Sequence, residues 1–282
     1  MQQRPFQQVD VFTATPYLGN PVAVVLQGDG LSEAQMQQFA RWTNLSETTF
    51  VLTPQDAQAD YRLRIFTPGG EMQFAGHPTL GSCHAWLQAG GDPKLGAQVV
   101  QECGVGLVRI RRDGSTLAFG APPLRRSEPA AALLARVSAA LGLQFNQMLG
   151  AQLLDNGTAW LGIRVDGADT VLRLAPDFAA LKAVGHKVGV AGVHHGAAAG
   201  QPALEVRGFA PHMGIDEDPV TGSLNASLAQ WLMADGHMPA SYVAAQGACL
   251  HRAGRVSLQR DADGQLWVGG AAVSCISGTV TI

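Results

Sequence analysis

The sequence predicts an α+β fold of two pseudo-symmetric domains, residues 1–122 and 123–282, each a curved mixed β-sheet wrapped around a central α-helix. Many short apolar segments rich in β-branched residues are separated by glycine and proline turns, which is typical of strands. Each half also contains one helical segment that follows a glycine-rich loop, and the two loops resemble each other. The last strand or strands can return to the first domain.

Composition limits the classes of function. Of the 282 residues, 46% are hydrophobic and 15% are charged, which excludes a disordered chain. The formal net charge of −3 gives no electrostatic basis for binding nucleic acid or an anionic membrane. The N-terminal residues form no apolar signal segment, and no run of about 18 apolar residues could span a bilayer. We therefore expect a cytoplasmic protein.

The four cysteines lie far apart in the sequence and show no zinc-binding spacing. They are expected to be reduced, buried thiols, although a disulfide or a catalytic thiol pair is the alternative. His194 and His195 are adjacent, but no third ligand follows at a suitable distance, so no metal site is expected. The cysteines are Cys83, Cys103, Cys249 and Cys275.

In the first half, alternating or continuous apolar residues predict a series of strands. Ser32 is placed to cap a helix that ends near Trp42. A second helix is expected from Leu80 to Gln88, before the glycines and proline of residues 90–93. Residues 120–123 contain two prolines and mark the crossover to the second domain. The predicted strands are residues 8–13, 22–26, 48–52, 61–66, 98–102, 106–111 and 116–119.

In the second half, Ser127 is expected to cap a helix over residues 129–141, which Gly142 would end. The loop 214–223 precedes a periodic helix whose leucines and tryptophan share one face. These apolar residues are Leu224, Leu228, Trp231 and Leu232. The predicted strands are residues 152–154, 159–165, 203–209, 255–259, 266–268 and 278–282.

A faint internal repeat indicates two pseudo-symmetric domains, and a chance similarity is the alternative. Residues 77–86 (HPTLGSCHAW) resemble residues 218–227 (DPVTGSLNAS), since both contain a polar residue, a proline, a threonine, Gly-Ser and then a helix. The start of a helix offers unpaired N–H groups and binds phosphate or carboxylate, and glycine allows close approach. Two such loops, at Gly76 and Gly222, would together hold a small acid. The alternative is that both glycines only permit tight turns.

Three ionisable residues could carry chemistry. Glu47 lies between a predicted helix and an apolar strand, where a partly buried carboxyl group could exchange protons; the alternative is a solvated glutamate in a turn. His77 could orient a substrate or move a proton, or it could only cap a helix. Asp218 could hold the substrate, or it could be an ordinary acidic residue near a helix start. Neither glycine-rich loop matches a nucleotide-binding motif, so a nucleotide is not expected.

Six segments, in order along nearly the whole chain, resemble the phenazine-biosynthesis-protein-F-like (PhzF-like) family of the diaminopimelate epimerase-like superfamily. The pair Gly-His-Pro-Thr and Glu-Asp-Pro-Val-Thr-Gly-Ser is the most specific part of the resemblance. The matching segments are residues 9–13 with 19–24, residues 44–50, residues 66–68 with 71 and 76–79, residues 155–157 with 160, residues 217–223, and residues 254–255 with 268–270.

The resemblance implies a cofactor-independent isomerase that moves a proton on a small carboxylate substrate, in a cleft between the two domains. It also implies a homodimer. The family's catalytic residues correspond to Glu47 as general acid/base, with His77, Asp218 and Ser223. The residues expected to bind substrate are Gly19, Asn20, Gly76, Pro78, Thr79, Thr221 and Gly222.

Two other functions stay open. One is an amino-acid epimerase or racemase in which Glu47 works with His77 or Asp218. The other is a catalytically silent ligand-binding protein on the same fold. The related racemases use two opposed cysteines, but Ala75 precedes one loop here and Leu224 follows the other. A mechanism with two thiols is therefore disfavoured.

Overall fold

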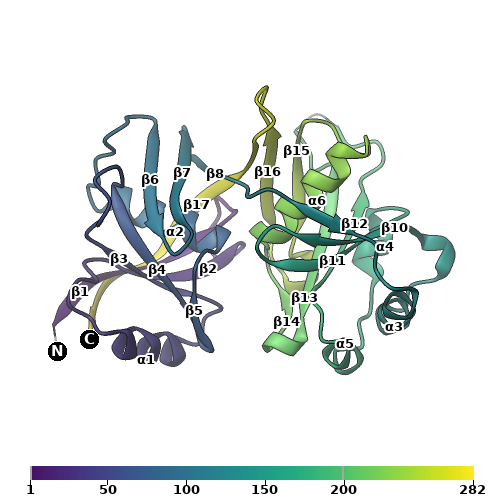
Figure 1. The fold of residues 1–282 in the computed structure, drawn as a ribbon, viewed down its shortest axis with the longest axis horizontal. Coiled ribbons are helices and arrows are strands. Elements are labelled where there is room, and N and C mark those ends of the chain that lie inside the picture. Colours follow the sequence, from purple (N-terminus) through teal and green to yellow (C-terminus); the bar gives the residue numbers. More distant parts are fainter. Residues whose placement is uncertain (1, 199) are drawn as a thin grey trace. The chain divides into compact units, whose positions relative to one another are not determined.

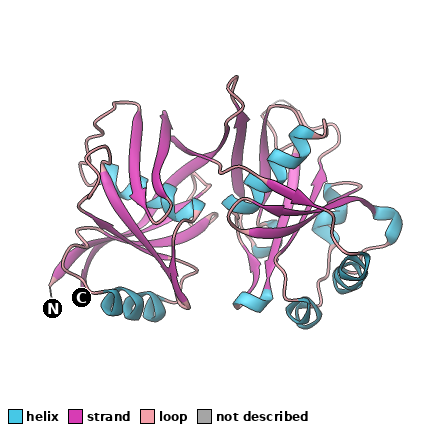
Figure 2. Cartoon of the chain, viewed as in Figure 1, coloured by secondary structure: helices cyan, strands magenta, loops and turns pink. Residues whose placement is uncertain are grey.

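A computed structural model describes residues 2–198 and 200–282, and the chain divides into two compact units. Unit 1 consists of Met1–Gly120 and Gly269–Ile282, and unit 2 is Ala121–Val268 (Figure 1). The chain is sheet-dominated with few helices, as the sequence predicts (Figure 2). The described helices all fall short of the length and apolar character that a membrane crossing needs.

The sheet of unit 1 is mixed and closes on itself. β2 pairs in parallel with β3, and β4 with β6, whereas the pairs β1–β2, β3–β4, β6–β7 and β7–β8 are antiparallel. The last strand, β17, pairs with both β1 and β8 and so completes the circuit. The strands are β1 (Gln3–Val11), β2 (Asn20–Val25), β3 (Thr48–Leu52), β4 (Tyr61–Thr67), β5 (Gly70–Met72), β6 (Gln98–Cys103), β7 (Gly106–Asp113), β8 (Thr116–Gly120) and β17 (Leu266–Thr281), whose residues before Gly269 belong to unit 2.

Helix α2 (Gly76–Gln88) lies inside the closed sheet of unit 1 (Figure 1). A Cβ atom on Gly81 would lie only 2.4 Å from Val22 Cγ1, so a small residue is needed where the helix meets β2. The helix begins four residues before the predicted start at Leu80. Pro78 did not prevent this, because a proline in the first turn removes no intrahelical hydrogen bond. Helix α1 (Glu33–Thr43) packs Met36 and Ala40 against Phe50 and Phe66.

Unit 2 is a second mixed sheet. β11 pairs in parallel with β12, and β13 with β15. The strands are β9 (Arg125–Ser127), β10 (Met148–Asp155), β11 (Ala159–Val165), β12 (Val188–Val193), β13 (Leu204–Ala210), β14 (Ile215–Asp218), β15 (Ser241–Gln246) and β16 (Gly254–Arg260). The helices are α3 (Ala131–Leu141), α4 (Ala168–Arg173), α5 (Phe178–Val184) and α6 (Gly222–Ala234), with short 3₁₀ turns at Phe145–Gln147, Pro211–Met213 and Ala248–Leu250.

The same order of pairings surrounds the central helix in each unit. In unit 1, β4 forms a hairpin with β5, α2 follows, and β6 returns parallel to β4. In unit 2, β13 forms a hairpin with β14, α6 follows, and β15 returns parallel to β13. Each hairpin therefore delivers the chain directly to the first turn of a buried helix.

Several sequence predictions need correction. Ser127 ends β9, and the helix after it begins at Ala131 with Ala130 as its N-cap. The two predicted C-terminal strands, residues 266–268 and 278–282, belong to or adjoin one strand, β17. Helix α6 is buried almost all around rather than on one face, because sheet surrounds it and its small residues allow close packing. β5, β9, α4, α5, β12, β14 and β15 were not predicted.

Candidate active site

Glu47 and His77 lie together in unit 1. The Glu47 Oε2 and His77 Nε2 atoms are 3.3 Å apart, and their side chains are only 14% and 7% exposed. At this distance the imidazole and the carboxylate interact electrostatically, and either group can accept or release a proton. The solvated turn glutamate that the sequence allowed is therefore not what the structure shows.

Local structure fixes the position of Glu47. Asn44, in the left-handed conformation with φ of 54°, ends α1 and reverses the chain. The Ala23 N–H donates to the Glu47 carbonyl at 3.4 Å, which ties the loop to β2. The next residue, Thr48, is fully buried, and its hydroxyl lies 2.8 Å from the Thr43 hydroxyl. Glu47 is therefore presented at the start of β3 by a loop anchored on both sides.

His77 is the second residue of α2, and a buried polar network supports this helix. Gln101 Nε2 donates to the Thr79 hydroxyl at 3.1 Å, and the Tyr61 hydroxyl donates to Gln101 Oε1 at 3.0 Å. Ser82 donates to Thr49 at 2.8 Å. Thr79, expected from the sequence to bind substrate, is fully buried and uses its hydroxyl within this network.

The other expected binding residues of unit 1 are also buried. Asn20 is 1% exposed and begins β2. The Gly19 N–H donates to the buried Asp10 carboxylate at 3.2 Å. A Cβ atom on Gly19 would lie 2.3 Å from the Val11 carbonyl oxygen, so only glycine is accommodated there. Gly76 and Pro78 lie in the buried first turn of α2.

In unit 2, Asp218 and Thr221 belong to one hydrogen-bonded network centred on Gln246. The Thr221 hydroxyl donates to Asp218 Oδ2 at 2.6 Å. Gln246 Nε2 donates to the Thr221 hydroxyl at 2.9 Å and to the Asp218 carbonyl at 3.1 Å. Gln246 Oε1 accepts from the Thr221 N–H at 2.9 Å and from Asn225 Nδ2 at 2.8 Å. Sequence analysis missed Gln246, which organises the loop before α6.

Ser223 is the second residue of α6 and is held by two side chains. Trp160 Nε1 donates to the Ser223 hydroxyl at 3.2 Å, and Asn156 Nδ2 donates to the Ser223 carbonyl at 3.1 Å. Both partners come from the β10–β11 hairpin. Because Trp160 already donates to the Ser223 oxygen, the hydroxyl proton is available to donate elsewhere.

A buried ion pair fixes β14, which carries Asp218. Arg207 of β13 donates to both carboxylate oxygens of Glu217, at 2.9 and 2.7 Å, and both side chains are 5% exposed. Arg207 also donates to the Val171 and Leu174 carbonyls near the end of α4. A bidentate pair of this kind defines orientation as well as attraction. The position of Asp218 is therefore fixed by the ion pair of Glu217, the residue before it.

The two helix starts align differently from the sequence repeat. The repeat matches His77 with Asp218. Both helices are 13 residues long. When their first residues, Gly76 and Gly222, are aligned, His77 corresponds to Ser223. In this alignment Thr79 corresponds to Asn225, and each of them bonds a buried glutamine, Gln101 or Gln246. The buried helix, rather than the proline dipeptide, is the feature shared by the two units.

All four cysteines are free, so no disulfide joins them. Only Cys83 is buried, so the expectation of four buried thiols was wrong for Cys103, Cys249 and Cys275, all of which are free. Burial raises the pKa of Cys83 to about 12, which keeps this thiol protonated at neutral pH. Among the described residues, no group of three His, Cys, Asp or Glu side chains could hold a metal ion. His194 instead pairs with Glu205 at 3.0 Å.

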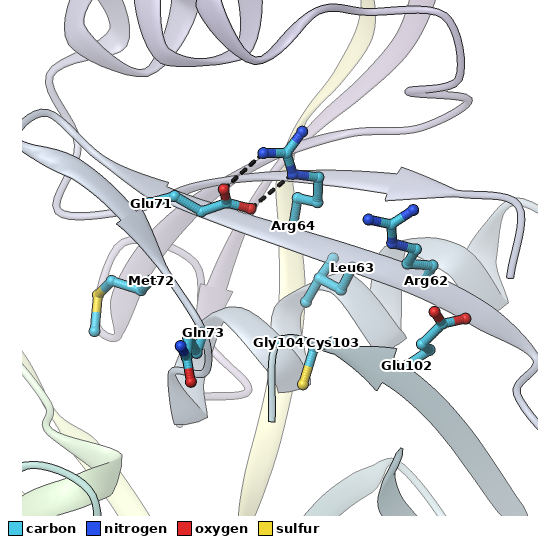
Figure 3. A pocket seen from close by; sticks show the side chains of 9 residues that line it. All are labelled: Arg62, Leu63, Arg64, Glu71, Met72, Gln73, Glu102, Cys103 and Gly104. Carbon is cyan, nitrogen blue, oxygen red and sulfur yellow. Dashed lines mark hydrogen bonds and ion pairs between the residues drawn. The ribbon is translucent and has the colours of Figure 1, made fainter. Parts of the chain in front are cut away.

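A pocket of about 390 Å³ lies on unit 1 beside β4, β5 and β6 (Figure 3). Arg64 and Glu71 face each other there, 2.6 Å apart, and neutralise each other. None of the predicted catalytic or binding residues lines this pocket. Its lining residues are Arg62, Leu63, Arg64, Glu71, Met72, Gln73, Glu102, Cys103 and Gly104.

Comparison with known proteins identifies the relatives of this chain. A model of the phenazine biosynthesis-like protein family (PhzC-PhzF) matches residues 9–278. A Schizosaccharomyces pombe protein named antisense-enhancing sequence 1 is 38% identical over 292 residues, covering 99% of each chain. The trans-2,3-dihydro-3-hydroxyanthranilate isomerase of Pseudomonas fluorescens is 34% identical over 230 residues, covering 82% of this chain and 80% of that protein.

Solved structures agree with this assignment. A PhzF-family protein of Bacillus anthracis has a TM-score of 0.86 at 24% identity, with full coverage of both chains, and so shows the same fold. A protein of Pseudomonas aeruginosa named a predicted epimerase has a TM-score of 0.80 at 27% identity and 99% coverage of each chain. The fold and the sequence therefore lead to the same set of relatives.

Proposed function

The chain belongs to the phenazine biosynthesis-like family and is an isomerase or epimerase, and on that premise we propose that it is a cofactor-independent isomerase with Glu47 as its general acid/base. The observation that carries this proposal is the Glu47–His77 contact of 3.3 Å between two largely buried side chains. A general base needs both a proton acceptor and a partner that orients it, and this pair supplies both.

In the proposed reaction, the Glu47 carboxylate removes a proton from a carbon next to a carboxylate or conjugated system of the substrate. The C–H bond breaks, an O–H bond forms on Glu47, and the electron pair moves into the conjugated system. Glu47 then returns the proton to another carbon. The His77 N–H holds the carboxylate while its charge changes.

We propose that the first turn of each central helix helps to bind the substrate. The N–H groups near Gly76 and Gly222 would stabilise the charge that develops on the substrate. Asp218 and Ser223 would orient the substrate. The networks around Gln101 and Gln246 support this role, since preorganised donors need fixed backbones. The family resemblance further suggests a homodimer.

Solvent deuterium tests the proposal. The protein is incubated in D₂O with trans-2,3-dihydro-3-hydroxyanthranilate and with a panel of cyclic and linear amino acids, and products are analysed by NMR and mass spectrometry. We expect one of these carboxylates to be isomerised, with a C–H bond relocated or replaced by C–D. Glu47→Gln should catalyse neither change. Failure of every carboxylate to react or exchange, despite measurable binding, would instead indicate a silent binding protein.

The same experiment separates isomerisation from epimerisation. An epimerase inverts the configuration of one carbon and introduces deuterium at that carbon. The proposed isomerase instead moves a double bond and transfers a hydrogen from one carbon to another. The epimerase is the second candidate because a similar solved structure from Pseudomonas aeruginosa is named a predicted epimerase. Glu47 and His77 are in contact and so lie on one side of a bound carbon, which means that a different group would have to act on the opposite face. Chiral chromatography of the product decides between them.

A further inference from the structure

Unit 2 places a lysine beside the first turn of α6, at a position that the predicted site did not include. β11 and β12 are parallel neighbours, and Leu161 is paired with Val188. Lys187 and Trp160, each one residue earlier, are therefore adjacent and point to the same face of the sheet. Gly189 lies two residues after Lys187 and therefore faces the same side of the sheet. A Cβ atom on Gly189 would lie 2.2 Å from Leu224 Cδ1, so α6 covers this side.

The contacts of Trp160 connect Lys187 with Ser223. Lys187 Nζ lies 5.6 Å from the centre of the Trp160 ring. At the same time, the Trp160 indole N–H donates to the Ser223 hydroxyl at 3.2 Å. Trp160 is only 4% exposed and so cannot change position freely. One rigid aromatic side chain thus fixes a cation and a hydroxyl on the same side of the sheet.

His212 adds to this environment from the 3₁₀ turn Pro211–Met213, which follows β13. Burial, followed by the positive charges of Lys187 and His186, lowers the pKa of His212. The lowered pKa favours the neutral form of His212 at neutral pH, whereas Lys187 contributes a positive charge to its surroundings. Glu217 follows this 3₁₀ turn in the sequence, and its carboxylate accepts two hydrogen bonds from Arg207.

We propose that Lys187, held against Trp160, binds a carboxylate group of the substrate next to Ser223, and that it makes the site selective for acids over their uncharged amides. This inference rests on the proposed function and assigns the anionic end of the substrate to unit 2. An ammonium group and the N–H groups at the start of α6 act on the same anion, and their attraction adds.

The test compares Lys187→Met with the matched control Lys182→Met. Methionine keeps an apolar chain against Trp160 and removes the charge, and Lys182 is an exposed lysine on α5. Calorimetric titrations use 3-hydroxyanthranilate and its carboxamide as probes. We expect the wild-type protein and Lys182→Met to bind the acid at least about 10-fold more tightly than the amide. Lys187→Met should lose this preference, and Lys187→Arg should keep most of it.

Kinetics give a second readout with the substrate found in D₂O. For Lys187→Met we expect KM to rise about 10- to 100-fold and kcat to change by less than about threefold, as for a positioning residue. Equal binding of acid and amide to the wild-type protein, no measurable binding of the acid, or a preference that survives in folded Lys187→Met would each overturn the inference. An active Glu47→Gln variant would contradict the proposed function alone, because the titrations do not depend on turnover.

Discussion

Replacing Glu47 by glutamine is expected to reduce kcat by at least about 10²-fold while leaving the protein folded, since general acid–base groups contribute about 10²–10⁴-fold. The amide has the same shape as the carboxyl group and can occupy the same place beside the His77 Nε2 atom, which lies 3.3 Å from Glu47 Oε2. What is lost is only the ability to take and return a proton. Steady-state kinetics on the substrate identified in D₂O measure this effect.

Glu33→Gln is the control for this variant. Glu33 is also a glutamate of unit 1, but its side chain is 72% exposed and pairs with Arg64 on the surface. We expect its kcat to equal that of the wild-type protein, because a surface pair contributes little. Both variants should melt within a few degrees of wild type. A Glu47→Gln variant that keeps more than a tenth of wild-type kcat would show that another group moves the proton.

The second large effect is expected for Gln246→Ala. The side chain is 1% exposed and takes part in four hydrogen bonds with Asp218, Thr221 and Asn225. Its removal leaves buried donors and acceptors without partners, so the free energy of unfolding should fall by about 3 kcal/mol. kcat/KM should fall as well, since Asp218 and Thr221 lose their fixed positions. Urea unfolding and kinetics measure the two effects separately.

Gln259→Ala provides the comparison, because Gln259 is exposed on β16 and pairs with Ser241 of β15. Its unfolding free energy should change by less than about 0.5 kcal/mol. If Gln246→Ala is as stable as Gln259→Ala and equally active, then the network does not organise the loop before α6. A loss of stability without a loss of activity would make Gln246 a purely structural residue.

Local signals in the sequence predicted much of the fold. β3 and β11 have the predicted bounds, because continuous apolar, β-branched runs are bounded by turn residues. Ser32 caps α1 as expected, and Gln35 completes a capping box that stabilises the same turn. By contrast, α4 and α5 contain six and seven residues, too few to produce a clear helical period.

The candidate site was predictable only in part. The motifs named Glu47, His77, Asp218 and Ser223, but their residue types alone did not distinguish a working site from solvated turns and caps. The supporting residues Gln246 and Arg207 gave no signal, since a buried glutamine or arginine is recognised by partners that are distant in sequence. Gln246 contacts Thr221 across 25 residues, and such pairing follows from the fold rather than from local pattern.

A crystal structure of Glu47→Gln with 3-hydroxyanthranilate tests the central claim most directly. We predict that one bound molecule has its carboxylate beside Ser223 and Lys187, accepts hydrogen bonds of about 2.7–3.2 Å from backbone N–H groups at a helix start, and places a ring carbon against the residue 47 amide. The account is contradicted if the ligand occupies a cavity that residue 47 does not line, or if residue 47, His77 and Ser223 face separate surfaces.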